Sequence, residues 1–177
     1  WILDICLASK KDRKDMYDAV ELGANMHILS RPSMYSPYSD YPEISVPELQ
    51  KLDGLLPGQP VRTKEQIQFQ QFSTPHDYAY AINWIANVKQ SDVVLEPSAG
   101  TGNIAAFAMT AGARVATNEL SPRRAALLRT LNPTQVFEED AEQLDNILPP
   151  DVKPTVVVMN PPFSQTGGRV ATRDIMV

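Results

Sequence analysis

The sequence predicts an α/β fold built on a mostly parallel, doubly wound sheet. Three short runs of largely apolar residues, at 92–96, 114–118 and 155–159, are bounded by turn residues, as is typical of strands buried in a parallel sheet. Helical candidates lie between them at 103–111 and 122–131, the second with Ser121 as N-cap and Pro122 at its first position. Alternation of strand and helix in this order indicates βαβ units.

Two further units precede this region. Residues 1–30 are predicted to form an N-terminal helical segment, because apolar side chains recur at helical spacing among charged neighbours before Gly23. Residues 31–60 are predicted to be a proline-rich linker, since proline breaks helices and removes a backbone donor. One short helix is expected inside it, at 47–55, with proline in its first turn. Residues 61–177 would then form the core.

The composition argues against several functional classes. The 177 residues contain 16 Lys and Arg against 21 Asp and Glu, a net charge of −5, so tight electrostatic binding of nucleic acid by this chain alone is not expected. One cysteine and two histidines exclude an internal disulfide and argue against a zinc site, and we expect no metal. No run reaches the roughly 18 apolar residues of a membrane span. We therefore expect a soluble, cytoplasmic protein without a membrane partner.

The first candidate site follows the run at 92–96 and reads Glu96-Pro97-Ser98-Ala99-Gly100-Thr101-Gly102. Its glycines permit a sharp turn and a close approach of the backbone to a ligand. The helix that follows offers free N–H groups beside that turn. Glu119 ends the next strand, where a carboxylate can accept hydrogen bonds from both ribose hydroxyls. These features predict a nucleoside cofactor.

The identity of this cofactor depends on Glu96. The spacing of Gly100, Gly102 and Ala105 also fits a dinucleotide fingerprint, which leaves an NAD-dependent oxidoreductase as a distant alternative. A carboxylate at the strand end would repel a pyrophosphate, whereas it suits S-adenosylmethionine, which carries a sulfonium and an amino group. A structural role for Glu96, capping the glycine loop, is compatible with either cofactor.

The second candidate site is Asn160-Pro161-Pro162-Phe163, directly after the run at 155–159. Proline has no N–H and a fixed φ, so the Pro161 carbonyl can be held toward a cleft. Together with the Asn160 side-chain oxygen it offers two acceptors to one NH₂ group. Phe163 can stack on the flat group that bears this amine. Asn160, Pro161, Pro162 and Phe163 are therefore the catalytic candidates.

The motifs EPSAGTG and NPPF together resemble those of S-adenosylmethionine-dependent amino-methyltransferases, in particular N6-adenine DNA methyltransferases. The resemblance implies a partial Rossmann-like methyltransferase fold. It also implies that Phe72-Ser73-Thr74-Pro75 touches the methionine carboxylate of the cofactor, and that Asp140-Ala141 accepts a bond from its adenine amine. The cofactor-binding candidates are Phe72, Thr74, Glu96, Pro97, Ser98, Ala99, Gly100, Gly102, Glu119, Leu120, Asp140 and Ala141.

More narrowly, residues 61–168 are similar to the methyltransferase domain of plasmid- and phage-borne methyltransferase–helicase proteins of the strawberry-notch type. This resemblance implies methyl transfer to an exocyclic amine, with adenine N6 in DNA as the first expectation. RNA or protein-glutamine N-methylation stays open, as does a non-catalytic cofactor-binding module.

The family's remaining strands, the second aromatic residue that sandwiches the base and the recognition domain have no counterpart in the sequence. We therefore expect a core truncated at its C-terminal end, within a larger polypeptide that has recognition or helicase regions. Binding of DNA by this chain alone should be weak, with Arg169 and Arg173 available to neutralise phosphates.

Overall fold

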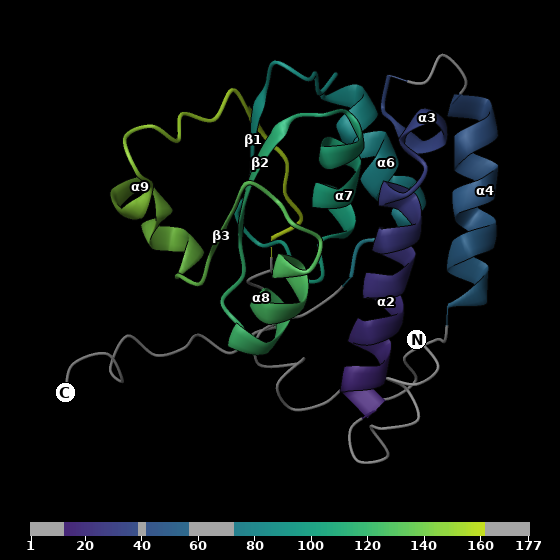
Figure 1. The fold of residues 1–177 in the computed structure, drawn as a ribbon, viewed down its shortest axis with the longest axis horizontal. Coiled ribbons are helices and arrows are strands. Elements are labelled where there is room, and N and C mark those ends of the chain that lie inside the picture. The colour runs from purple at the N-terminus through teal and green to yellow at the C-terminus, as the bar shows by residue number, and fades with distance from the viewer. Residues whose placement is uncertain (1–12, 39–41, 57–72, 162–177) are drawn as a thin grey trace.

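A computed structural model describes residues 13–38, 42–56 and 73–161, and the fold is that of these residues. At its centre lies a four-stranded sheet with strand order β3-β2-β1-β4, in which every pairing is parallel (Figure 1). The strands are β1 (Val93–Glu96), β2 (Arg114–Asn118), β3 (Gln135–Phe137) and β4 (Val156–Val157). The predicted α/β fold with a parallel sheet is confirmed.

The sheet register follows from burial of the alternate side chains. Val94 pairs with Val115 on one side and with Val156 on the other, and this layer faces the larger core. The three predicted strands are present, although β4 keeps only two residues of the predicted run. Strand β3 was not predicted, because Gln-Val-Phe is short and only half-buried and shows no clear alternation.

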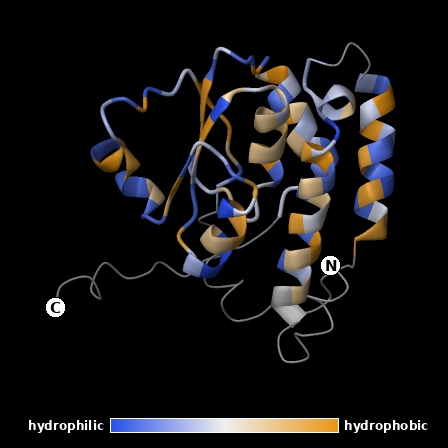
Figure 2. Ribbon diagram, viewed as in Figure 1, coloured by the Kyte–Doolittle hydropathy of each residue, from blue (hydrophilic) through white to orange (hydrophobic). Residues whose placement is uncertain are grey.

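Helices cover one face of the sheet. In Figure 1, helices α2, α4, α6 and α7 lie on the same side of the strands. Figure 2 shows α7 in mostly hydrophobic colours, whereas α4 alternates between hydrophilic and hydrophobic residues. This difference fits their places, since α7 is packed between the sheet and other helices and α4 lies on the outside. The bounds are α2 (Arg13–Leu29), α4 (Pro42–Leu55), α6 (His76–Ile85), α7 (Asn103–Thr110) and α8 (Pro122–Arg129).

Two aromatic rings hold the helical layer together. Tyr80 of α6 and Phe107 of α7 are buried in the main core and meet edge to face, with ring centroids 5.7 Å apart. Ile28 of α2 and Leu49 of α4 belong to the same core. The predicted helix at 103–111 is therefore confirmed as α7, and α2 confirms the described part of the predicted N-terminal helix.

The predicted linker differs from the structure. Within residues 31–60 the chain forms α3 (Pro32–Tyr35) and α4, so the prediction of loop is wrong for residues 32–35 and 42–46. The helix predicted at 47–55 is present, but it is the second part of the longer α4. Pro32 and Pro42 each stand at the first residue of a helix, where no backbone donor is lost. Pro47 lies inside α4, and burial of Leu49 offsets its cost. The division of the chain into three units stays a prediction.

The opposite face of the sheet carries a thinner layer. The short helices η1 (Ala141–Gln143) and α9 (Leu144–Ile147) follow β3, and Figure 1 places α9 on the side away from α7. Leu95, Ala116 and Val152 form a small core there. Across the ranges that the structure describes, no helix is long and apolar enough to cross a membrane.

Candidate functional site

The candidate site lies where the order of the strands reverses. Strand β1 has β2 on one side and β4 on the other. The segments that follow β1 and β4 therefore begin next to each other, at the point where the strand order changes direction. Open α/β sheets bind ligands at such points, outside the carboxyl ends of the strands. The glycine loop leaves β1 and Asn160 follows β4, which puts both predicted motifs at this position.

The glycines of the loop adopt left-handed backbone conformations. Gly100 has a φ of 58° and Gly102, the N-cap of α7, has a φ of 95°. A Cβ on Gly102 would lie 2.7 Å from Leu131 Cδ1 and 2.8 Å from Leu128 Cδ1. Gly102 is therefore required by its backbone conformation and by the close packing of Leu128 and Leu131. Contact of Gly102 with a cofactor stays a prediction.

Glu119 joins the glycine loop to the start of α8. Its Oε2 accepts from the Gly100 N–H and its Oε1 from the Ser121 N–H, both at 2.8 Å. Ser121 is the N-cap of α8 as predicted, although its hydroxyl makes no capping bond. The neighbouring Leu120 is 50% exposed, so an apolar side chain stands open to solvent beside this carboxylate.

Glu96 is buried at the end of β1. It accepts a backbone hydrogen bond from Ala105 of α7, and its Oε2 has no hydrogen-bond partner among the described residues. Burial raises the pKa of this carboxyl well above its usual value; the nearby Glu119 charge raises it further, and the bond from Ala105 acts in the opposite direction. This geometry fits the capping role that the sequence left open. Contact of Glu96 with a cofactor stays a prediction.

A third carboxylate follows β3. Asp140 is exposed and accepts at 3.0 Å from the backbone N–H of Glu142, as the N-cap of η1. Asp140 therefore stands at the end of the strand adjacent to the one that precedes Glu119. Ala141 is exposed at the start of η1, and Ser98 is half-buried in the loop after β1.

Asn118 is a site residue that the sequence analysis missed. Its side chain donates to the carbonyls of Pro97, at 3.0 Å, and Glu139, at 2.8 Å, and accepts from the Glu139 N–H at 2.9 Å. Its own carbonyl accepts from the Ala99 N–H. Asn118 thus ties together the loops after β1 and β3, which carry the predicted cofactor residues. The sequence could have indicated Asn118 only through its position at the end of a predicted strand.

Thr74 of the FSTP motif and Asn160 of the NPPF motif are in contact. The side-chain amide of Asn160 donates to Thr74 Oγ1 at 3.0 Å. Pro161 is exposed directly after Asn160. Phe72, Pro162 and Phe163 lie outside the described residues, as do Arg169 and Arg173, and their roles stay predictions.

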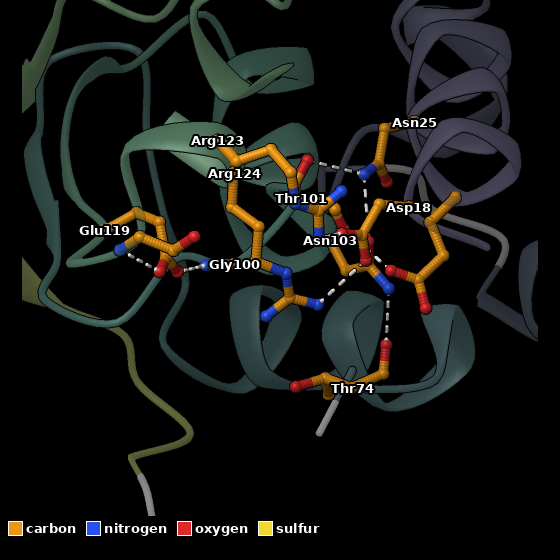
Figure 3. A network of polar contacts seen from close by, with 11 residues as sticks. Asp18, Asn25, Thr74, Gly100, Thr101, Asn103, Glu119, Arg123 and Arg124 are labelled. Atoms are coloured by element: carbon orange, nitrogen blue, oxygen red, sulfur yellow. Dashed lines mark hydrogen bonds and ion pairs between the residues drawn. The ribbon is translucent and has the colours of Figure 1, made fainter. Parts of the chain in front are cut away.

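Polar side chains of α2 reach the glycine loop, and the sequence analysis missed them as well (Figure 3). Thr101 Oγ1 donates to Glu21 at 2.9 Å, and the Asn25 amide donates to the Thr101 carbonyl at 3.0 Å. Asp18 pairs with Arg123 and Arg124 of α8. The spacing of Asp18, Glu21 and Asn25 places them on one face of α2, and this polar stripe was the signal available in the sequence.

The groups at these strand ends, of which Asp140 and Leu120 are exposed and Glu119 is buried, suit the adenosine part of S-adenosylmethionine. Carboxylates at the ends of two adjacent strands, Glu119 and Asp140, can accept from ribose hydroxyls and from an adenine amine. Leu120 stands next to Glu119 with half of its surface exposed, as a side chain that covers an adenine ring would. The residues present therefore fit this cofactor.

Neither a scan against protein-family models nor a search of curated proteins found a match. Among solved structures, the chain is similar to a protein from Pyrococcus horikoshii described as a putative RNA methyltransferase, with a TM-score of 0.53 and 23% sequence identity. The match covers 70% of this chain and 63% of that protein, so the chain spans less than two thirds of its length. On this likeness and on its parallel sheet, the chain has a methyltransferase-like Rossmann fold.

Proposed function

We propose that the protein binds S-adenosylmethionine at the carboxyl ends of its strands and transfers the methyl group to an exocyclic amine, with adenine N6 in DNA as the target. The observation that carries this proposal is the bond between Thr74 and Asn160. It brings the segment assigned to the methionine end of the cofactor against the residue assigned to the target amine.

In this proposal three side chains hold the cofactor. Glu119 binds the ribose hydroxyls, Asp140 binds the adenine amine, and Leu120 covers the adenine ring. Thr74 lies at the methionine end. When bound, the cofactor supplies an electrophilic methyl group on a sulfonium.

The target amine is held by acceptors after β4. The amide nitrogen of Asn160 is engaged with Thr74, so the amide oxygen is the atom left to accept from the incoming NH₂ group. The Pro161 carbonyl is the second acceptor. Two fixed acceptors orient the nitrogen lone pair toward the methyl carbon, and orientation of this kind lowers the barrier. With the cofactor bound, Asn160 and the Pro161 carbonyl would hold the amine while its nitrogen takes the methyl group from the sulfonium, and the amine would release one proton to solvent.

RNA is the second candidate substrate. The name of the Pyrococcus protein refers to RNA, and the Asn160 site would accept the adenine amine of either nucleic acid. The narrower resemblance to methyltransferase–helicase proteins favours DNA. With a net charge of −5, we propose that nucleic acid binds weakly and with strong salt dependence unless other regions contribute.

Labelled methyl transfer to adenine-containing DNA and RNA single strands tests the proposal. Asn160→Ala should lower turnover by about 100-fold or more, because misorientation of a reacting group is penalised steeply. Affinity for S-adenosylhomocysteine, measured by calorimetry, should change little. Asn146→Ala, an exposed asparagine of α9, is the control. Near-normal turnover of Asn160→Ala would refute the amine-transfer mechanism, and binding of NAD in place of S-adenosylhomocysteine would refute the cofactor.

A further inference from the structure

We infer that Asn103 is a positioning residue for the target amine, which fixes Thr74 and, through Thr74, the catalytic Asn160. This inference rests on the proposed function, because it gives Asn103 a task in the same site. It also gives the N-terminal helices a task, since they hold Asn103 in place. Neither connection was visible in the sequence.

The first step is the double attachment of Thr74. Asn103 is the first residue of α7 and follows the glycine loop directly. Its amide nitrogen donates to the Thr74 carbonyl at 2.8 Å, while the Thr74 hydroxyl accepts from Asn160 at 3.0 Å. The backbone of Thr74 is thus held by the loop after β1, and its side chain holds the residue after β4. A shift of Asn103 would therefore move the partner that orients Asn160.

The second step is the orientation of the Asn103 amide. Its oxygen accepts from the Asn25 amide nitrogen at 2.8 Å. Asn103 is 6% exposed and Asn25 is fully buried, so water cannot replace this partner. A flipped amide would place two NH₂ groups against each other and leave the Thr74 carbonyl without its donor. The nitrogen of Asn103 is therefore directed at Thr74 (Figure 3).

The third step is the anchoring of Asn25 on α2. Its nitrogen also donates to the Thr101 carbonyl at 3.0 Å, and its oxygen lies 3.1 Å from His76 Nε2. His76 is fully buried, and both its backbone N–H and its Nδ1 bond to the Asp53 carboxylate of α4. The hydrogen bonds thus run from Asp53 of α4 through His76 of α6 and Asn25 of α2 to Asn103. Buried polar networks of this kind rigidify a site when every member is satisfied.

A purely structural role for Asn103 is the competing explanation, and Asn83 allows the two to be separated. Asn83 is also a fully buried asparagine, and its nitrogen donates to the carbonyls of Ala79, at 2.9 Å, and Ile104, at 3.0 Å. It therefore joins α6 to α7 much as Asn103 joins α7 to the loop before α6. None of its hydrogen bonds reaches Thr74 or Asn160. Asn83→Ala is the matched control.

The kinetic test compares Asn103→Ala with Asn83→Ala in the methyl-transfer assay. Both substitutions should lower the melting temperature. Only Asn103→Ala should lower kcat, by about 10-fold or more, with the KM for S-adenosylmethionine changed by less than about threefold, because a misplaced acceptor slows the reaction without removing cofactor contacts. Equal kcat values for the two variants would overturn the inference. Should Asn103→Ala fail to fold, Asn103→Asp keeps the size and the acceptor and should show the same loss of kcat.

A second measurement does not depend on activity. In a ¹⁵N spectrum of this 19.6 kDa chain, the side-chain amide signals of Asn160 are identified by their loss in Asn160→Ala. They should move in Asn103→Ala and stay in place in Asn83→Ala, without cofactor or substrate. Unmoved signals in Asn103→Ala would overturn the positioning role. If the signals move but the native protein transfers no methyl group, the proposed function fails while the coupling of Asn103 to Asn160 stands.

Discussion

Asn160 donates from its side-chain amide to the hydroxyl of Thr74, a residue 86 positions earlier in the sequence, at 3.0 Å. The two residues belong to motifs that the sequence singled out for different tasks, one at the cofactor and one at the target amine. Their direct contact means that the orientation of Asn160 depends on the loop before α6. Between the described residues of the two motifs, this hydrogen bond couples the two halves of the candidate site.

Replacement of Thr74 by valine tests this coupling. Valine keeps the shape of threonine and removes the hydroxyl, so the Asn160 amide loses its partner at a cost of about 1–3 kcal/mol for the unsatisfied group. We expect turnover to fall by about 10-fold. Thr74→Ser keeps the hydroxyl and should retain most of the activity. Equal turnover of the valine and serine variants, measured by labelled methyl transfer, would contradict the coupling.

Glu119 offers a test of the cofactor assignment. Glu119→Gln should weaken binding of S-adenosylhomocysteine by about 1–3 kcal/mol, the scale of a lost charge-assisted hydrogen bond to a ribose hydroxyl. Glutamine keeps one oxygen that can still accept from Gly100 or Ser121. Calorimetry gives the affinities, and Glu48→Gln on the outer helix α4 is the control. If Glu119→Gln leaves the affinity unchanged, the Glu119 carboxylate does not bind the ribose.

The strands and helices nearest the site could be predicted because their sequences are locally unambiguous. The apolar runs that form β1, β2 and β4 end in turn residues, and α8 begins with Ser-Pro. Helix α4 was predicted only in part, because a high density of proline ordinarily breaks helices. Proline at the first position of a helix forfeits no hydrogen bond, so the packing of Leu49, Val46 and Leu52 in the core distinguishes that helix from a loop.

The polar contacts of the site could not be predicted from sequence for a different reason. Asn25 is separated by 78 positions from Asn103 and by 76 from Thr101, its partners at the glycine loop. An asparagine on a helix is ordinarily exposed, and nothing local distinguishes one that is buried against a distant loop. Motif residues such as Glu119 were found because their place at a strand end is itself informative.

Gly102→Ala should destabilise the protein strongly. The added Cβ would meet Leu128 and Leu131 at 2.8 and 2.7 Å, at a φ of 95° that alanine rarely adopts. Backbone strain and overpacking each cost about 1–3 kcal/mol. Gly54→Ala is the matched control, since nothing lies within 4 Å of its added Cβ in helix α4, and it should stabilise by about 0.5–1 kcal/mol. Urea unfolding of the two variants measures both effects. Equal unfolding midpoints for Gly102→Ala and Gly54→Ala would contradict the packing argument.

Glu96 predicts a pH dependence of stability. Burial raises the pKa of this carboxyl well above the usual 4.5, so the folded state holds the proton more tightly than the unfolded chain. Between pH 4.5 and the raised pKa, the folded state binds more protons than the unfolded chain does. The free energy of unfolding therefore falls as the pH rises through this range. The total loss is about 1.4 kcal/mol for each unit by which the two pKa values differ.

Glu96→Gln removes this titration and should flatten that part of the pH profile. Glu21, whose pKa burial also raises, titrates in both proteins and cancels from their difference. Urea unfolding from pH 4.5 to pH 8 should therefore show the glutamine variant gaining in stability over the native protein as the pH rises. Glu43→Gln, at an exposed position of α4, is the control for the loss of a surface charge. Parallel profiles for Glu96→Gln and the native protein would mean that Glu96 is ionised in the fold, as direct contact with a cationic cofactor would require.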